Sequence, residues 1–278
     1  KRPSKIGTAL RRRSQLYVPG NNERMIRKSS ELQADSVILD WEDAVPPAEK
    51  EEAKRLLRKL SDEISWRKRE LCVRVNGLDT PWGMKDLLDA SNFNLDTIVI
   101  PKAETELSFV RTATGKNVIP LIETGRGIVK MEVIVRSEGV EAVSYGVGDF
   151  AAAMGGEIHA YESSIYLKTR VVTIAKAYGV DAIDRVFFDI KNIPLFKSDA
   201  FEAKKLGFVG KQVIHPDQVT AANEVFTPAV EELEWSRKVV KAYDEATKSG
   251  RGAISLEGKL IDAVHYRIAK KILENAEA

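Results

Sequence analysis

Residues 118–127 read VIPLIETGRG, an apolar run that ends abruptly in Glu123 and a glycine-rich turn. Residues 141–150 read EAVSYGVGDF, which repeats the pattern and ends in Asp149. Both runs are typical of a buried strand whose last residues become polar. In parallel α/β proteins the active site lies where the carboxyl ends of the strands meet. The two acidic residues therefore mark a predicted active face.

Short apolar runs of this kind recur along the chain, with helical patterns between them. They lack polar–apolar alternation, which is typical of strands buried on both faces. One intervening stretch, residues 51–64, carries alanine, leucine and isoleucine at helical spacing. The predicted strands are 15–20, 35–43, 71–77, 96–102, 117–123, 141–149, 184–190 and 207–216.

Eight strands with helices between them favour a (β/α)8 TIM barrel, an α/β fold, over an open doubly wound sheet. No GxGxxG follows the first strand, which weakens a dinucleotide-binding interpretation. The 278 residues leave room for a barrel of about 250 residues and an appendage. After the last strand the pattern changes to helices and a glycine-containing, hairpin-like turn. We therefore expect a catalytic barrel domain over 1–226 and a C-terminal helical extension over 227–278, serving as a lid or an oligomerisation element.

Composition narrows the classes of function. The chain has 43 Lys and Arg against 41 Asp and Glu, a net charge of +2, which argues against a general nucleic-acid-binding surface. Cys72 is the sole cysteine, so neither a disulfide framework nor a cysteine metal site is possible, and a cytoplasmic location is expected. No run of 18 apolar residues predicts a membrane span. The basic start, residues 1–14, is open to interpretation as a solvated tail, a phosphate-contacting arm or a remnant of an organelle-targeting segment.

Glu123 and Asp149 are the first candidates for chemistry. Carboxylates at the ends of two consecutive strands can share a hard divalent cation, and Mg²⁺ usually takes one or two protein carboxylates. The alternative is that each acid caps the helix that follows it. Because both acids stand at neighbouring strand ends, the pair favours a Mg²⁺ site.

A second acidic group stands in LDWEDAV, residues 39–45, which holds Asp40, Glu42 and Asp43. Burying three carboxylates without a cation is costly. Arg74, at the end of the next strand, is the predicted partner. Two interpretations remain open: a structural arginine–acid cluster, or an Arg74 that polarises a substrate carbonyl and stabilises an enolate-like oxygen.

Two further groups of residues are candidates for a functional role. The basic residues around the first strand, Arg12, Arg13, Arg24 and Lys28, either grip the phosphates of a nucleotide-like handle or form a solvated face. His215, in GKQVIHP, is either a catalytic base or a support for the strand end.

Taken together, these motifs resemble the citrate lyase β-subunit/malyl-CoA lyase family, the CoA-ester lyases of the HpcH/HpaI aldolase superfamily. The resemblance extends in family order from Arg12 to Asp262. Two segments, GKQVIHPDQV and VVTIAKAYGVDAID, are most similar to the citramalyl-CoA lyase branch, which is known from mitochondria. The matching segments are RRSQLYVPGNN, VILDWEDAV, VRVNG, IVIPK, IETGRGI, GVGDF, GKQVIHP and GRGAISLEGKLIDA.

The resemblance implies roles for individual residues near the predicted strand ends. Glu123 and Asp149 match the family's Mg²⁺ ligands, and Arg74 matches the arginine that contacts the oxo acid or the enolate. Glu42 and Asp43 match acids that support the waters on the metal.

Other matched residues lie outside this group. Asp262 matches an aspartate that a lid supplies to the active site of a neighbouring subunit. Arg13, Arg24 and Lys28 fall where the family binds the adenine–phosphate end of CoA. A homotrimer, or a hexamer built from trimers, is implied as well.

The implied activity is Mg²⁺-dependent cleavage of a β-hydroxyacyl-CoA, malyl-CoA or citramalyl-CoA, to acetyl-CoA and an α-oxo acid, glyoxylate or pyruvate. Three alternatives stay open. The first is a citrate lyase β-subunit that acts on a citryl thioester of an acyl-carrier protein and releases oxaloacetate. The second is a malyl-CoA thioesterase, and the third is a non-catalytic metal-binding relative. The location is then cytoplasmic, or the mitochondrial matrix for a eukaryotic chain.

Overall fold

The computed structural model describes residues 10–66 and 69–277. These form two compact units, one of residues 12–66 and 69–226 and one made of residues 10–11 and 227–277. None of the helices that the described residues form has both the length and the apolarity needed to cross a bilayer.

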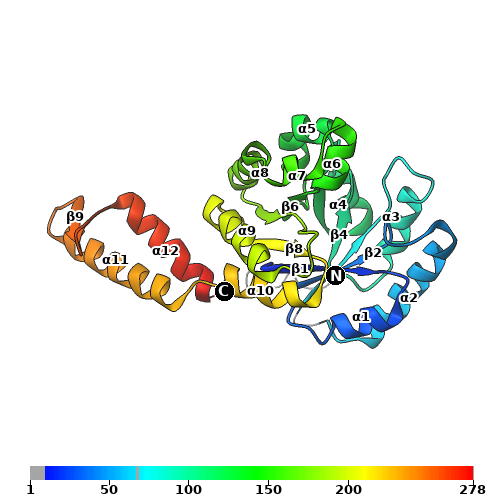
Figure 1. The fold of residues 1–278 in the computed structure, drawn as a ribbon, viewed down its shortest axis with the longest axis horizontal. Helices are drawn as coiled ribbons and strands as arrows, with labels where there is room; N and C mark the ends of the chain where they lie inside the picture. The colour runs from blue at the N-terminus through cyan, green and yellow to red at the C-terminus, as the bar shows by residue number, and fades with distance from the viewer. Residues whose placement is uncertain (1–9, 67–68, 278) are drawn as a thin grey trace. The chain divides into compact units, whose positions relative to one another are not determined.

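The larger unit is a closed barrel of eight parallel strands, in which each strand pairs with the next along the chain and β8 pairs with β1 (Figure 1). This confirms the predicted (β/α)8 fold. The strands are β1 (Ser14–Pro19), β2 (Ser36–Asp40), β3 (Glu70–Arg74), β4 (Thr97–Ile100), β5 (Asn117–Ile122), β6 (Ala142–Tyr145), β7 (Asp181–Asp184) and β8 (Gly210–Val213).

Helices surround the strands and bury an apolar core between the two layers (Figure 1). In α2 this buried face consists of Ala53, Leu56, Leu57 and Leu60. The elements are α1 (Glu23–Ser29), the short 3-10 helix η1 (Pro47–Glu49), α2 (Lys50–Glu63), α3 (Gly83–Ser91), α4 (Ser108–Thr114), α5 (Gly125–Val135), α6 (Val147–Met154), α7 (Ile158–Glu162), α8 (Ile165–Ala177), α9 (Ile193–Leu206) and α10 (Pro216–Phe226).

The barrel interior is arranged in layers. Its middle is a separate apolar cluster of one or two residues from each of several strands, including Ile38, Cys72 and Val99. Cys72 is fully buried there, as expected of a strand residue. Side chains alternate along a strand, so residues two positions further on, Asp40 and Arg74, point to the same interior side at the carboxyl end.

A salt-bridge network centred on Arg12 lies at the amino end of the barrel. Arg12 forms two hydrogen bonds of 2.9 Å to the buried carboxylate of Glu70, and it contacts Asp181 and Glu141 at 3.1 Å each. Since these partners come from β3, β7 and the residue before β6, one guanidinium ties together strands across the barrel.

The predicted strand at 184–190 is wrong, because β7 occupies Asp181–Asp184. Gly179, with a φ of +70°, follows the end of α8, and β7 begins two residues after it, at Asp181. The strand therefore starts three residues before the predicted one. The apolar residues that suggested the later strand belong to the loop after β7. Among them, Phe187 packs edge-on against Phe196 of α9, with ring centroids 5.9 Å apart.

The smaller unit contains α11 (Val230–Lys248), the antiparallel pair β9 (Ala253–Leu256) and β10 (Lys259–Asp262), and α12 (Ala263–Glu277). The hairpin turns at Glu257 and Gly258, both with positive φ, which is the backbone of a tight two-residue turn. Its small core consists of Val239, Ile261 and Ala269.

Candidate active site

Arg74 lies at the centre of a charged cluster at the carboxyl end of β3. Its guanidinium forms a bidentate pair with Asp40, with Nε–Oδ1 at 2.7 Å and Nη2–Oδ2 at 2.6 Å. Its Nη1 lies 3.1 Å from Oε2 of Glu42, and the guanidinium carbon lies 5.0 Å from the centre of the Tyr17 ring. The predicted pairing of Arg74 with the acids of residues 39–45 is thus confirmed.

Asp40 is a structural anchor for this arginine. Its two carboxylate oxygens also accept hydrogen bonds from the backbone N–H groups of Glu42 and Ala44, at 2.9 and 3.1 Å. Burial lowers the pKa of Arg74, but its hydrogen bonds to Asp40 and the charges around it outweigh this and raise the pKa well above its ordinary value. Arg74 therefore carries a permanent positive charge.

Glu42 is buried beside Arg74. Its Oε1 accepts a hydrogen bond of 2.8 Å from Lys102 Nζ. Its Oε2 has no well-aligned hydrogen-bond partner, so the contact with Arg74 is an ion pair of 3.1 Å rather than a directed hydrogen bond. Burial raises the pKa of Glu42, and the opposing charges of Arg74 and Lys102 only partly offset this. Asp43, by contrast, points to solvent with 63% of its side chain exposed.

Buried polar contacts hold the backbone of this acidic segment in place. The ammonium of Lys50 donates to the carbonyl oxygens of Trp41 and Glu42 at 2.8 and 3.1 Å, and to Asn76 Oδ1 at 2.6 Å. Asn76 is fixed in turn by Asp86, which accepts hydrogen bonds from its backbone and side-chain nitrogens. The position of Glu42 is therefore set by neighbours from α2, α3 and the loop after β3.

Glu123 follows β5 directly and is 4% exposed. It does not cap the next helix, because Thr124 does so by accepting a hydrogen bond of 3.0 Å from the Gly127 N–H. Burial, together with the charges of Glu42 and Asp149, raises the pKa of Glu123 to about 7 against the opposing effect of Arg74. A buried carboxylate without a capping role is a candidate metal ligand.

Gly146 leaves room for this carboxylate. A Cβ added at Gly146 would lie 2.5 Å from Oε1 of Glu123, closer than any non-bonded contact allows. The backbone of Gly146 is extended, so the glycine is required by the close approach of Glu123 rather than by its dihedral angles.

Asp149 lies in the first turn of α6, four residues after β6 ends, rather than at the end of a strand as predicted. It is 39% exposed, and its Oδ1 is 3.4 Å from Lys102 Nζ. Asp149 contributes to the electrostatic environment of Glu123, so the two predicted metal ligands do belong to one cluster.

Lys102 is the residue of this site that the sequence analysis missed. Its ammonium lies between Glu42 and Asp149, and its backbone N–H donates to Glu123 Oε2 at 2.9 Å. The signal available in the sequence was the lysine that ends IVIPK, at the carboxyl end of a predicted strand.

Arg13 is separated from this cluster. It precedes β1, at the amino end of the barrel, and Asp35 holds its guanidinium through hydrogen bonds of 2.8 Å. The strands run from this end to the end that carries Glu123, so we do not include Arg13 in the proposed binding site.

Arg24 and Lys28 are exposed on α1, which follows the carboxyl end of β1. They are four residues apart and therefore share one face of the helix. Within the described residues neither forms an ion pair, so both charges are available to a ligand.

Asp262 and His215 both contact the start of a helix. Asp262 Oδ1 accepts hydrogen bonds from the N–H groups of Val264 and His265 at 2.9 and 3.2 Å, and it lies 2.7 Å from His265 Nδ1. The hydrogen bond to the His265 ring lowers the pKa of Asp262. His215 Nδ1 accepts from the Asp217 N–H at 3.2 Å, a local contact that fits a supporting role.

The cluster meets the chemical requirements of a hard divalent cation. Glu123 and Asp149 supply oxygen ligands only, and Glu42 is close by. Within the described residues no group of three or more Asp, Glu, His or Cys side chains converges into a complete metal cage. Mg²⁺ takes one or two protein carboxylates and keeps water or substrate oxygens in its other positions, so Glu123 and Asp149 alone are candidate protein ligands.

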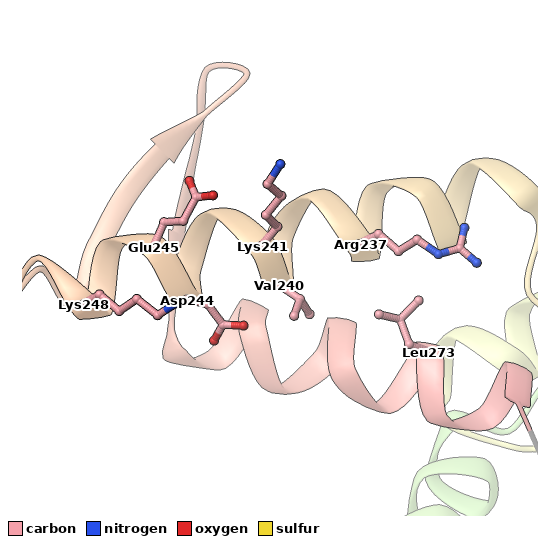
Figure 2. A pocket seen from close by; sticks show the side chains of 7 residues that line it. All are labelled: Arg237, Val240, Lys241, Asp244, Glu245, Lys248 and Leu273. Atoms are coloured by element: carbon pink, nitrogen blue, oxygen red, sulfur yellow. The ribbon is translucent and has the colours of Figure 1, made fainter.

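A groove of about 400 Å³ lies between α11 and α12 (Figure 2). It contains none of the residues of the acidic cluster, which we define as Glu42, Glu123 and Asp149. Its exposed lining carries charges of both signs and gives no basis for a catalytic site. The lining residues are Arg237, Val240, Lys241, Asp244, Glu245, Lys248 and Leu273.

The barrel and the acidic cluster at its carboxyl end define a TIM-barrel protein equipped for metal-assisted chemistry. The chain belongs to the HpcH/HpaI aldolase/citrate lyase family, whose model matches residues 13–216. The family predicted from the sequence motifs is thereby confirmed.

Relatives with named activities cover nearly the whole chain. It is 32% identical to a (3S)-malyl-CoA thioesterase of Cereibacter sphaeroides, over 96% of this chain and 95% of that protein. It is 32% identical to the L-malyl-CoA/beta-methylmalyl-CoA lyase of Rhodobacter capsulatus, over 95% and 94%. It is 30% identical to the mitochondrial citramalyl-CoA lyase of Rattus norvegicus, over 94% and 85%.

Solved structures agree with this family. CitE from Mycobacterium tuberculosis, in complex with magnesium, acetoacetate and coenzyme A, superposes with a TM-score of 0.81 at 28% identity, covering 95% of this chain and 98% of that one.

Proposed function

We propose that this protein is a Mg²⁺-dependent carbon–carbon lyase that cleaves a β-hydroxyacyl-CoA, malyl-CoA or citramalyl-CoA, to acetyl-CoA and glyoxylate or pyruvate. The observation that carries this proposal is that Lys102 contacts Glu42, Asp149 and Glu123 beside a permanently charged Arg74 at the carboxyl end of the barrel. The named lyases among the relatives support it.

Glu123 and Asp149 would hold the Mg²⁺, and Glu42 and the outer Asp43 would orient its waters. When bound, the ion supplies Lewis-acid polarisation of the substrate's hydroxyl and carboxylate oxygens. The reaction removes the hydroxyl proton, breaks the adjacent C–C bond and leaves an oxo acid and the enolate of acetyl-CoA. A proton added to the enolate carbon completes the product.

Arg74 would stabilise the enolate oxygen. The Nε–H and one N–H of Nη2 of Arg74 donate to Asp40, and its Nη1 faces Glu42. The other N–H groups on Nη1 and Nη2 remain for a ligand. Because Asp40 fixes the guanidinium plane before any ligand arrives, the positive charge is preorganised.

Asp262 stays our candidate for the acid that protonates the enolate carbon, supplied by a neighbouring subunit. Its contacts in this structure favour a second interpretation, a helix cap, because its Oδ1 accepts from the first amides of α12 and its pKa is lowered. The Asp262→Asn variant discussed below separates the two roles.

Arg24 and Lys28 are proposed to contact the phosphates of CoA. A homotrimer or hexamer is proposed as the assembly, supported by the exposed apolar side chains of Leu260, Val264 and Ile268 in the smaller unit. An acyl-carrier protein would be a partner only of a citrate lyase subunit. The proposed location is the cytoplasm, or the mitochondrial matrix for a eukaryotic chain.

The thioesterase named among the relatives makes thioester hydrolysis the second candidate. In that reaction the same acidic cluster would direct water to the thioester carbonyl. An assay on malyl-CoA, citramalyl-CoA and citryl-CoA, with oxo acid and free thiol detected separately, distinguishes the two. Mg²⁺-dependent oxo acid without thiol is expected; thiol release would shift the assignment to a thioesterase, and inactivity on all three would contradict both.

A further inference from the structure

Lys102 occupies a position in the acidic cluster that none of the proposed catalytic roles explains. Its ammonium is 2.8 Å from Glu42 Oε1 and 3.4 Å from Asp149 Oδ1. It thus bridges the acid of the loop after β2 and the acid in the first turn of α6. The ammonium lies on the same carboxylates to which a divalent cation or its waters would bind.

The backbone of Lys102 makes a contact of its own, with Glu123, and has an unusual conformation. Its φ of 47° is in the left-handed region, which is unfavourable for a residue with a side chain. This conformation accompanies the hydrogen bond from its N–H to Glu123 Oε2, at 2.9 Å. Glycine would adopt the backbone at lower cost, whereas lysine adds an ammonium that reaches Glu42 and Asp149.

Charge balance suggests that function. Four carboxylates, those of Asp40, Glu42, Glu123 and Asp149, surround this end of the barrel together with the cations of Arg74 and Lys102. With all of them ionised, four negative and two positive charges leave two negative charges, which one divalent cation neutralises. Arg74 is locked onto Asp40, whereas the Lys102 side chain is 36% exposed and has room to turn towards solvent.

We propose that Lys102 is a built-in counter-ion that weakens the affinity of the acidic cluster for its divalent cation, so that the metal must compete with the ammonium for Glu42 and Asp149. This proposal rests on the metal site in the proposed function. It assigns Lys102 a positioning and tuning role and no direct contact with the reacting atoms.

The test is isothermal titration of MgCl2 into the full chain after treatment with EDTA. Lys102→Met removes the charge and keeps a side chain of similar length, so Mg²⁺ should bind on the order of tenfold more tightly. Lys102→Arg keeps the charge and should stay within about threefold of the wild type. Lys102→Gly removes the charge and relieves the backbone, and it should also bind more tightly.

Lys130→Met is the matched control, because Lys130 is exposed on α5 and its loss changes the net charge by the same amount. It should leave the dissociation constant unchanged. If Lys102 only maintains the geometry of the cluster, Lys102→Met will bind Mg²⁺ more weakly than the wild type or equally well. Either result would overturn the proposal.

The outcomes separate this inference from the proposed function. Tighter Mg²⁺ binding by Lys102→Met in a protein without lyase activity would support the role of Lys102 and contradict the proposed reaction. Lyase activity in the wild type, with unchanged or weaker Mg²⁺ binding in Lys102→Met, would support the proposed reaction and contradict the role of Lys102. Absence of Mg²⁺ binding in every variant would overturn both.

Discussion

Asp40 and Arg74 are register partners on neighbouring parallel strands, and their side chains meet in a bidentate ion pair inside the barrel. Both are nearly buried, with 3% and 13% of their side chains exposed. The pair therefore serves the fold and the proposed chemistry together: Asp40 orients a guanidinium whose Nη1 faces Glu42.

Replacing Arg74 by methionine should destabilise the fold and abolish turnover. The change leaves Asp40 buried without its counter-charge, and breaking one side of a buried pair costs about 3–5 kcal/mol. The free energy of unfolding in urea measures this directly. Arg74→Lys retains the charge but not the bidentate geometry, so it should recover part of the stability while kcat/KM stays at least about tenfold below the wild type. Equal activity in Arg74→Lys would show that the fork geometry is dispensable.

Gly146→Ala should weaken Mg²⁺ binding by displacing Glu123. The added Cβ would lie 2.5 Å from Glu123 Oε1, so the carboxylate has to move. Gly148→Ala is the matched control two residues along, because its added Cβ meets only Phe188 at an ordinary 3.7 Å. Titration with MgCl2 should therefore separate the two variants, with Glu123→Gln as the reference for complete loss of binding. Unchanged affinity in Gly146→Ala would place the metal elsewhere.

Asp262→Asn should preserve the helix cap and remove the proposed acid. Asparagine caps helices as well as aspartate does, so the thermal midpoint should change little. Loss of a general acid typically lowers kcat by a factor of about 100 or more, whereas KM for the CoA ester should be retained. Normal turnover in this variant would leave Asp262 with the capping role alone.

The double variant Arg24→Met/Lys28→Met should raise KM for the CoA ester and leave kcat unchanged. Both side chains are exposed and lack ion-pair partners among the described residues, so their removal should not disturb the fold. Contacts between such cations and phosphates are screened by salt, so the difference from the wild type should shrink as ionic strength rises. Steady-state kinetics at low and high salt test this. A KM equal to that of the wild type at low salt would remove α1 from the CoA site.

Asp199 of α9 lies 2.7 Å from Lys211 Nζ of β8 and 3.1 Å from Arg185 Nη2 in the loop after β7. Asp199→Asn should cost stability in a manner that depends on pH. Burial would raise the pKa of Asp199, but the charges of Lys211 and Arg185 and the hydrogen bond from Lys211 outweigh it and lower the pKa to about 2 from its ordinary 3.8. A carboxyl group with a depressed pKa stabilises the fold above pH 3.8, and this contribution disappears as the pH falls through about 2. The shift corresponds to about 2 kcal/mol.

Urea unfolding of wild type and Asp199→Asn should therefore differ at pH 7 and converge as the pH is lowered towards 2. Lys211 keeps its other partner, Asp184, in the variant, so the fold should survive. A difference that stayed constant over this range would assign the effect to lost packing rather than to the charge of Asp199.

Most of the barrel was predictable because parallel strands buried on both faces have a recognisable local sequence pattern. Runs such as residues 118–122 are continuous, apolar and short, and the acid that follows marks the strand end. The run at 184–190 misled because a loop that packs its phenylalanine against α9 has the same composition as a buried strand. The ladders that residues 181–184 form with β6 and β8 distinguish the strand from the loop.

The candidate site was predictable to the extent that residue type and strand-end position define it. Glu123, Asp149, Glu42 and Arg74 were identified in this way, and the structure places them in one cluster. Lys102 was missed because a lysine after a strand is ordinarily solvated, and no local pattern reveals that its ammonium meets acids from the loop after β2 and from α6.

By itself the sequence determined the eight-stranded barrel, the family and the acids at the strand ends, since hydrophobic periodicity and short motifs are local properties of the chain. Only the tertiary structure decided which charges share a site: closure of the barrel brings Lys102 between Glu42 and Asp149, and strand direction puts Arg13 at the opposite end from Glu123. The physical reason is that ion pairing depends on distance in space. Residues 60 positions apart, as Glu42 and Lys102 are, come within 2.8 Å only when the fold forms.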